Sequence, residues 1–164
     1  MAPELPSRRA LDGRAPFETE ARALLTGLPD SACREAWLVD ADLAEWPLGQ
    51  ADVLDALTRW LRLPGRRLNL LALQFDSLAL RQARFAAWRV NFVHALDSRT
   101  PEDLEPDDMP CLLLAGPCCI RVHDRLRWRG SFSQETEDLQ RVREQIAAIS
   151  QRSAPSWPVR GLGL

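Results

Sequence analysis

The chain has 164 residues and a formal net charge of −2, with 46% hydrophobic and 27% charged residues. This length and composition suit one globular domain and exclude the need for disulfides or structural metals to stabilise its core. All 21 basic residues are arginines, which excludes mechanisms that need a lysine amine, such as a Schiff base or a P-loop.

The first half of the chain predicts alternating helices and strands after a leader. Residues 1–15 carry prolines and arginines without apolar periodicity, so we expect a mobile leader there. Apolar residues then recur at helical spacing or in short continuous runs, as amphipathic helices and buried strands require. The expected order is a helix at 17–28, a strand at 36–40, a helix at 51–63, a strand at 67–75 and a helix at 77–96.

The second half predicts strands and a final helix. Its expected elements are an acidic, proline-containing loop at 97–108, strands at 111–115, 118–122 and 126–128, a helix at 133–151 and a tail at 153–164. The last two strands are expected to form a hairpin around His123 and Asp124. Trp157 is an apolar anchor in the tail. The order predicts a single α/β domain at 16–152, with a mixed, partly parallel sheet flanked by helices.

Cysteine usage and the N-terminal sequence favour a reducing compartment. The N-terminus lacks the apolar core of a signal peptide and no stretch has the length of a membrane span, so we expect a cytoplasmic protein. Cys111, Cys118, Cys119 and His123 lack zinc-ligand spacing, and Cys118 and Cys119 would point to opposite faces of one strand. We therefore expect the cysteines to pack in the core, without a metal or other cofactor.

A Gly-Ser-Phe-Ser turn at residues 130–133 follows the last predicted strand, and Asp124 precedes it. With the order of elements between residues 17 and 150, this segment resembles one half of a phospholipase D-like fold. That superfamily carries His-x-Lys, an Asp five residues after the Lys, and then a Gly-Ser-x-Asn or similar turn. In this chain Pro117 occupies the His position and Cys119 the Lys position, and the segment between the Asp and the turn is one residue short.

The resemblance implies a non-catalytic member, similar to uncharacterised bacterial phospholipase D-like proteins without the full motif. Pro117 offers no nucleophile, and Cys119 offers no positive charge to hold a phosphate. Asp124 and Ser131 are the remaining catalytic candidates. Two halves pair about a twofold axis in the superfamily, so the resemblance implies a homodimer or another protein partner. The main functional prediction is a role in binding or assembly without enzymatic activity.

An acidic pair offers an alternative. Asp40 and Asp42 lie at the end of the predicted strand 36–40, where two carboxylates can hold Mg²⁺ and assist phosphoryl transfer. Haloacid dehalogenase-like phosphatases carry a similar Asp-x-Asp. This alternative predicts a Mg²⁺-dependent phosphatase or phosphotransferase, whereas the structural alternative is a solvated loop with helix-capping aspartates.

Alternating arginines offer a further alternative. Leu126 is expected to face the core, which would leave Arg125, Arg127 and Arg129 together on the other face of the hairpin. With Arg121, this strand is a candidate phosphate-binding surface and predicts a nucleic-acid-binding accessory module. The near-neutral net charge favours a structural role instead, as a protected edge or a partner of the acidic loop. We therefore do not expect nucleic acid as a partner.

Overall fold

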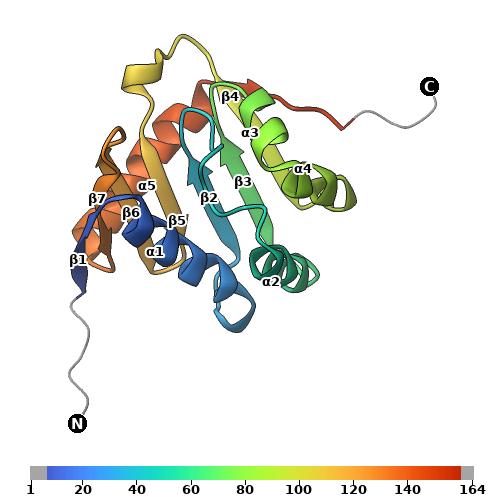
Figure 1. Ribbon diagram of the computed structural model, residues 1–164, viewed down its shortest axis with the longest axis horizontal. Coiled ribbons are helices and arrows are strands. Elements are labelled where there is room, and N and C mark those ends of the chain that lie inside the picture. The colour runs from blue at the N-terminus through green and yellow to red at the C-terminus, as the bar shows by residue number, and fades with distance from the viewer. Residues whose placement is uncertain (1–6, 160–164) are drawn as a thin grey trace.

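A mixed eight-stranded sheet forms the centre of the molecule in the computed structural model, which describes residues 7–159 (Figure 1). The strands are β1 (Arg8–Asp12), β2 (Glu35–Val39), β3 (Arg67–Leu71), β4 (Leu96–Pro101), β5 (Cys111–Ala115), β6 (Cys118–Asp124), β7 (Arg129–Ser133) and β8 (Ser153–Pro155). Their order across the sheet is β1-β7-β6-β5-β2-β3-β4-β8. Strands β2, β3 and β4 are parallel, and all other neighbours are antiparallel. The predicted fold class is confirmed.

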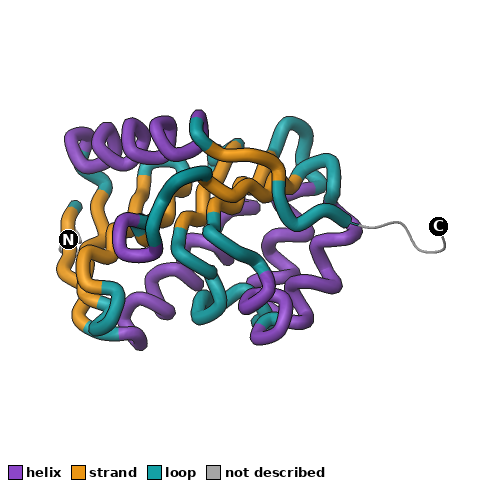
Figure 2. Tube along the Cα trace, turned by 90° about the horizontal axis from the view of Figure 1, so that it is seen from above, coloured by secondary structure: helices purple, strands orange, loops and turns teal. Residues whose placement is uncertain are grey.

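Helices cover both faces of the sheet, but unequally. They are α1 (Arg14–Thr26), α2 (Ala51–Leu61), α3 (Asp76–Arg81), α4 (Ala83–Arg89) and α5 (Thr136–Gln151), with 3₁₀ turns η1 (Leu28–Asp30), η2 (Val90–Phe92) and η3 (Pro106–Asp108). Figure 2 shows one long helix, α5, on one side of the strands and the other helices on the opposite side. Within residues 7–159, no helix is long and apolar enough to cross a lipid bilayer.

Strand alternation divides the core into two clusters. On the face under α1 to α4, buried residues such as Leu38, Leu70 and Ile120 join the larger cluster. On the opposite face, α5 packs its apolar stripe, which includes Val142, against a smaller cluster that contains Cys119. A single helix is too narrow to cover eight strands, so parts of this second face stay open on either side of α5.

The predicted helix at 77–96 is interrupted at Gln82. The backbone of Gln82 leaves the helical region (φ −119°, ψ 57°), which separates α3 from α4. Its side chain donates from Nε2 to the carbonyl oxygens of Ala44 (3.0 Å) and Trp46 (2.8 Å), and its Oε1 accepts from the Gly49 amide (3.1 Å). The break therefore positions a side chain that holds the loop after β2.

Residues 97–101, expected as the start of an acidic loop, belong to parallel strand β4. Asp97 and Arg99 lie on the face that carries α5, and they form an ion pair in which Arg99 Nε is 2.9 Å from Asp97 Oδ2. Ser98 and Pro101 are buried. The strand was not predicted from the sequence because its partly exposed positions Asp97 and Arg99 are charged and it ends on a proline.

Both predicted terminal segments contribute strands to the sheet. Arg8–Asp12, expected within a mobile leader, form β1 and pair with β7 along their whole length. In the predicted tail, Ser153–Pro155 form β8 beside β4, and Trp157 stacks on Phe75 with ring centroids 5.1 Å apart. Residues 1–6 and 160–164 of these segments lie outside the described residues.

Candidate functional site

Asp40, at the carboxyl end of β2, is held in a buried ion pair. Arg125 donates from Nε to Asp40 Oδ1 (3.0 Å) and from Nη2 to Oδ2 (3.2 Å). Oδ2 also accepts from the Leu43 amide and the Trp46 indole, each at 3.2 Å. Burial disfavours the charge of Arg125, but the hydrogen bonds to Asp40 together with the charges of Asp40, Cys111 and Glu45 outweigh burial and raise the pKa of Arg125. Asp40 is therefore a structural anchor.

The alternative of a Mg²⁺-dependent phosphatase finds no support in this geometry. Asp42 Oδ1 accepts from the Ala44 amide (3.0 Å) and lies 3.8 Å from Arg125 Nη2. Within residues 7–159, no group of three or more histidine, cysteine, aspartate or glutamate side chains is placed to hold a metal. The two aspartates accept from loop amides and bind Arg125, but Asp40 is buried and neither caps a helix, so the structural alternative of a solvated loop with helix-capping aspartates does not describe them.

The expected row of arginines on one face of a hairpin does not form. The register between β6 and β7 shifts between Val122 and Asp124, and the following residues form a turn in which Leu126 is 97% exposed. Arg127 Nη1 donates to Asp124 Oδ2 (3.3 Å), and Arg129 Nε donates to Asp12 Oδ1 (3.0 Å). The alternation fails because a bulge and a turn replace the straight strand.

The second face has an open region on the β1 side of α5, which we call the Arg121 cavity. Its volume is about 610 Å³. Its polar lining residues include Arg8, Asp40, Asp107, Asp108, Arg121, His123, Arg125, Ser131 and Gln145. The candidates Arg121 and Ser131 thus lie in one cavity, whereas Asp124 lies outside it and accepts from the Arg127 amide in the turn. Asp107 and Asp108 place negative charge at this cavity, so it is a poor site for a polyanion.

The residues at the phospholipase D-like positions have structural roles. Cys119 is fully buried under α5, and burial raises the pKa of its thiol to about 11. Gly130 is required by a close approach, because a Cβ atom there would lie 2.0 Å from the Arg121 carbonyl oxygen. Ser133 Oγ donates to Asp138 Oδ2 (2.6 Å) and accepts from the Glu135 amide (3.0 Å), which fixes the start of α5. Pro117 is exposed in the turn before β6.

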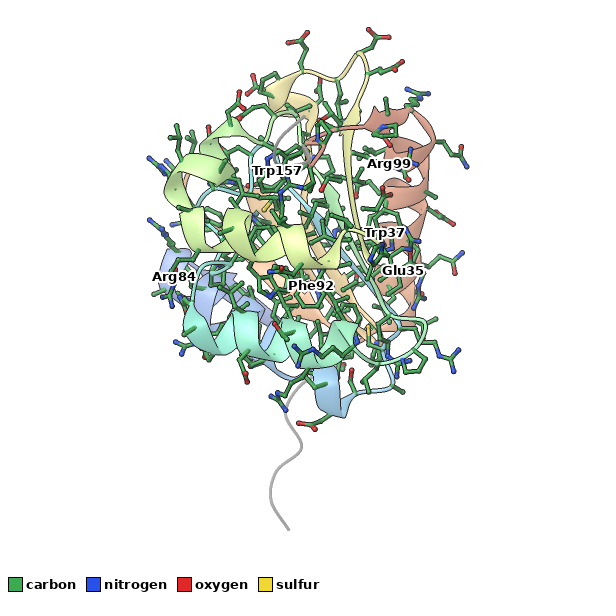
Figure 3. The ribbon with its side chains drawn as sticks, turned by 90° about the vertical axis from the view of Figure 1, so that its right-hand side faces the viewer. Glu35, Trp37, Arg84, Phe92, Arg99 and Trp157 are labelled. Atoms are coloured by element: carbon green, nitrogen blue, oxygen red, sulfur yellow. The ribbon has the colours of Figure 1, made fainter. Side chains whose placement is uncertain are left out.

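A second open region lies on the β4 side of α5, and we call it the Trp37 groove. Its volume is about 600 Å³. It is lined by Glu35, Trp37, Arg67, Asn69, Asp97, Arg99, Leu114, Arg143, Ile146, Ala147, Ser150 and Gln151. Figure 3 shows Glu35, Trp37 and Arg99 in a line beside α5. Trp37 pairs with Asn69 across β2 and β3, so a half-buried aromatic ring lies at the centre of this polar surface.

Two arginines without ion-pair partners among the described residues line the Trp37 groove. Arg67 and Arg143 are exposed and form no ion pair within residues 7–159. Arg34 is equally exposed, and its carbonyl oxygen accepts from the Arg67 amide (2.9 Å) at the same end of the sheet. Of the groove carboxylates, Asp97 is paired with Arg99, whereas Glu35 accepts from the neutral Asn69 Nδ2 (2.8 Å) and keeps its charge, so the three groove arginines outnumber the two carboxylates. The groove therefore offers unpaired positive charge beside an aromatic ring.

We did not predict this groove, although a signal for it exists in the sequence. Trp37 was expected only as part of an apolar strand. Arg67 and Asn69 alternate with leucines in a strand that looks almost continuously apolar, and Asp97 and Arg99 alternate in β4. Two polar alternations in adjacent strands indicate one open face, but only once β4 is known to be a strand.

Comparisons with known proteins give a match among solved structures. The sequence matches no family model and no curated protein. The fold is similar to the solved structure of TrmBL2, an archaeal chromatin protein that shows a novel mode of DNA binding, with a TM-score of 0.66 and 11% sequence identity. The alignment covers 93% of this chain and 54% of the TrmBL2 chain, so this chain spans about half the length of that neighbour. At this identity, the similarity shows a shared fold.

This comparison corrects the main functional prediction. We expected a bacterial, non-catalytic phospholipase D-like module that acts by binding or assembly and has no nucleic-acid partner. The structural neighbour is instead a DNA-binding chromatin protein of an archaeon. That functional prediction and the exclusion of nucleic acid are wrong, and the nucleic-acid alternative is better supported. No finding bears on the resemblance to the phospholipase D-like superfamily, which stays a prediction.

Proposed function

We propose that the protein binds single-stranded nucleic acid in the Trp37 groove. The observation that carries this proposal is the half-buried ring of Trp37 beside two exposed arginines without partners, Arg67 and Arg143. Proteins that bind single strands combine aromatic side chains, on which bases stack, with a positively charged groove that follows the backbone. The proposed location is the cytoplasm, where single-stranded RNA is abundant.

The size and walls of the groove suit a base and its phosphates. A volume of about 600 Å³ lies within the range of ligand sites, roughly 300–1,000 Å³. Leu114 and Ile146 supply apolar surface next to Trp37, while Arg67 and Arg143 lie at the polar part of the lining. A base stacked on Trp37 would place its phosphates within the reach of these two arginines.

The local charge matters more than the net charge here. At −2, the whole chain does not attract a polyanion over long distances. Arg34, Arg67 and Arg143 supply positive charge at one end of the second sheet face, so binding is expected to be local, of modest affinity and sensitive to salt.

Single strands fit the groove better than a duplex does. Trp37 is half-buried in the groove beside α5, and a base can stack on its ring only if its own face is free, as in an unstacked single strand. The structural similarity to TrmBL2 supports the broader class, because a DNA-binding protein contains a chain segment of the same fold. The assignment of the groove rests on the residues of this chain.

The test is the fluorescence anisotropy of a labelled oligo(dT) or oligo(U) strand at low salt. The Trp37→Leu variant removes stacking while it retains apolar packing, and we expect it to bind about tenfold more weakly. Arg143→Ala should weaken binding severalfold. Arg141→Ala is the matched control, because Arg141 is exposed two residues earlier on α5 and does not line the groove.

Two results would overturn the proposal. One is the absence of binding by the wild-type protein at low salt. The other is binding that survives both Trp37→Leu and Arg143→Ala but is lost in Arg127→Ala, which would return the interface to the β6–β7 hairpin. Circular dichroism of each variant separates lost binding from lost folding.

A further inference from the structure

A buried arginine at the end of α4 has no counter-charge. Arg89 is 8% exposed, and its guanidinium lies over the Trp157 ring at 3.5 Å from the ring centroid. Within residues 7–159 it forms no ion pair and donates no side-chain hydrogen bond to another residue. Burial lowers the pKa of Arg89. No Arg89 nitrogen is among the fully buried atoms that lack a partner, so the guanidinium of this largely buried residue can still donate hydrogen bonds to a ligand.

The aromatic surface below Arg89 is held rigidly. Trp157 stacks on Phe75 with an interplanar angle of 11° and lies 6.3 Å from the ring of Phe85. The Ser156 amide donates to the Ser98 carbonyl (2.9 Å), which extends the contact between β8 and β4 up to Trp157. The ring on which the Arg89 guanidinium lies is therefore held in place by packing and by a backbone hydrogen bond.

Arg89 lines a cavity of about 440 Å³, which we call the Arg89 cavity. Its lining residues are Arg89, Val90, Val93, Leu96, Asp97, Ser98, Pro155, Ser156, Trp157, Pro158 and Val159. Most of this lining is apolar, and Val90 and Val93 are exposed. Ser98 contributes an unsatisfied group, because its hydroxyl oxygen is buried and has no hydrogen-bond partner among the described residues.

We propose that the Arg89 cavity binds a small organic monocarboxylate with an apolar body. The planar guanidinium matches a carboxylate in two parallel hydrogen bonds, and the apolar body packs on Val90 and Val93. A single arginine balances one negative charge, so it matches a monocarboxylate better than a dianion such as phosphate. Among the described lining residues, the site shares only Asp97 with the Trp37 groove, and it does not depend on nucleic-acid binding.

The experiment titrates the full chain with benzoate and follows the indole N–H resonance of Trp157 by two-dimensional NMR, assigned with Trp157→Phe. Benzoate should shift this resonance saturably, while benzamide, which has the same shape without the charge, and inorganic phosphate should not. Arg89→Met should weaken benzoate binding at least tenfold. Arg84→Met is the matched control, because Arg84 is exposed on the same helix and does not line the cavity (Figure 3).

The wild-type titrations alone decide the proposal if Arg89→Met does not fold. Benzoate binding with no response to benzamide supports the site. The proposal is overturned if benzoate does not saturate the resonance, if benzamide or phosphate binds equally well, or if a folded Arg89→Met variant binds benzoate like the wild type.

Discussion

Arg125 in the Arg121 cavity and the two exposed arginines of the Trp37 groove are the same type of residue in opposite states. In the Arg121 cavity, Arg125 is bound to the buried carboxylate of Asp40 and stacks over Trp128 with its guanidinium 3.7 Å from the ring centroid. In the Trp37 groove, Arg67 and Arg143 are exposed and unpaired within residues 7–159. This difference shows that the number of arginines along a strand does not predict whether the strand forms a binding surface. Nearby carboxylates decide which arginines hold the fold and which remain available to a ligand.

The largest expected effect is on the free energy of unfolding, and it follows from removing Arg125 in the Arg121 cavity. Arg125→Met should destabilise the protein by about 3 kcal/mol, because it leaves the Asp40 carboxylate buried without its partner. Arg143→Met should change stability by less than about 0.5 kcal/mol. Urea unfolding followed by circular dichroism measures both. The Asp40→Asn, Arg125→Met double variant should recover part of the loss, and additive losses would contradict the coupling.

The packing of α5 against the sheet can be tested through Cys119, a buried cysteine of β6 that lies under this helix. Cys119 lies under α5 with a pKa of about 11, while Cys118 next to it is partly exposed. At pH 8, iodoacetamide should alkylate Cys118 about a hundredfold faster than Cys119, since the thiolate is the reactive form and Cys119 is shielded. Peptide mass spectrometry resolves the two sites. Equal rates would show that α5 lifts from the sheet in the native state.

The salt dependence of oligonucleotide binding tests how many arginines of the Trp37 groove contact phosphates. If two or three arginines neutralise phosphates, the logarithm of the binding constant should fall with the logarithm of salt concentration with a slope of about −2. Arg143→Ala should reduce the magnitude of the slope by about 0.7. Arg127→Ala, in the β6–β7 turn, should leave it unchanged. Anisotropy titrations across a salt series give the slopes. Equal slopes for the wild type and Arg143→Ala would exclude Arg143 from the interface.

The smallest effect concerns Glu45, a second partner of Arg125. Burial alone would raise the pKa of Glu45, but the charge and hydrogen bond of Arg125, with smaller contributions from Arg14 and Arg81, outweigh burial and lower it. Since the pKa is lower in the folded state, Glu45 stabilises the fold above its unfolded pKa, and this contribution is lost as the pH falls through the folded pKa. Glu45→Gln should cost less than about 1 kcal/mol near pH 7 and flatten the acid side of the stability curve. An unchanged acid side would contradict the assignment.

The apolar pattern was sufficient to predict most of the sheet and its cover. The strand expected at 111–115 is β5, and the helix expected at 51–63 contains α2. The pattern failed where polar residues lie in strands, as in β4 and β1. It also failed where one side chain ends a helix, as at Gln82, because its partners lie more than thirty residues away in the loop after β2.

The candidate site was harder to predict, because it depends on tertiary contacts. Leu126 and the arginines beside it have a perfect strand alternation, yet a register shift turns them into a loop. The pairing of Arg125 with Asp40 joins residues 85 positions apart. Trp37 looks like any core aromatic residue until the path of α5 is known. Residue type indicated possible chemistry, but the distribution of counter-charges and the cover of the sheet determined where it can occur.

The two outermost strands also limit how this protein can self-associate. A sheet edge offers unpaired backbone groups to a second molecule, and long apolar edges lead to fibres. Here β8 has three residues and includes Pro155, which has no amide hydrogen, while β1 carries Arg8, Arg9 and Asp12. Both edge strands are therefore poorly suited to pairing with a strand of another molecule. Recombinant preparations should stay monodisperse at high concentration, and lengthening β8 with Pro155→Val is the change most suited to create an aggregating edge.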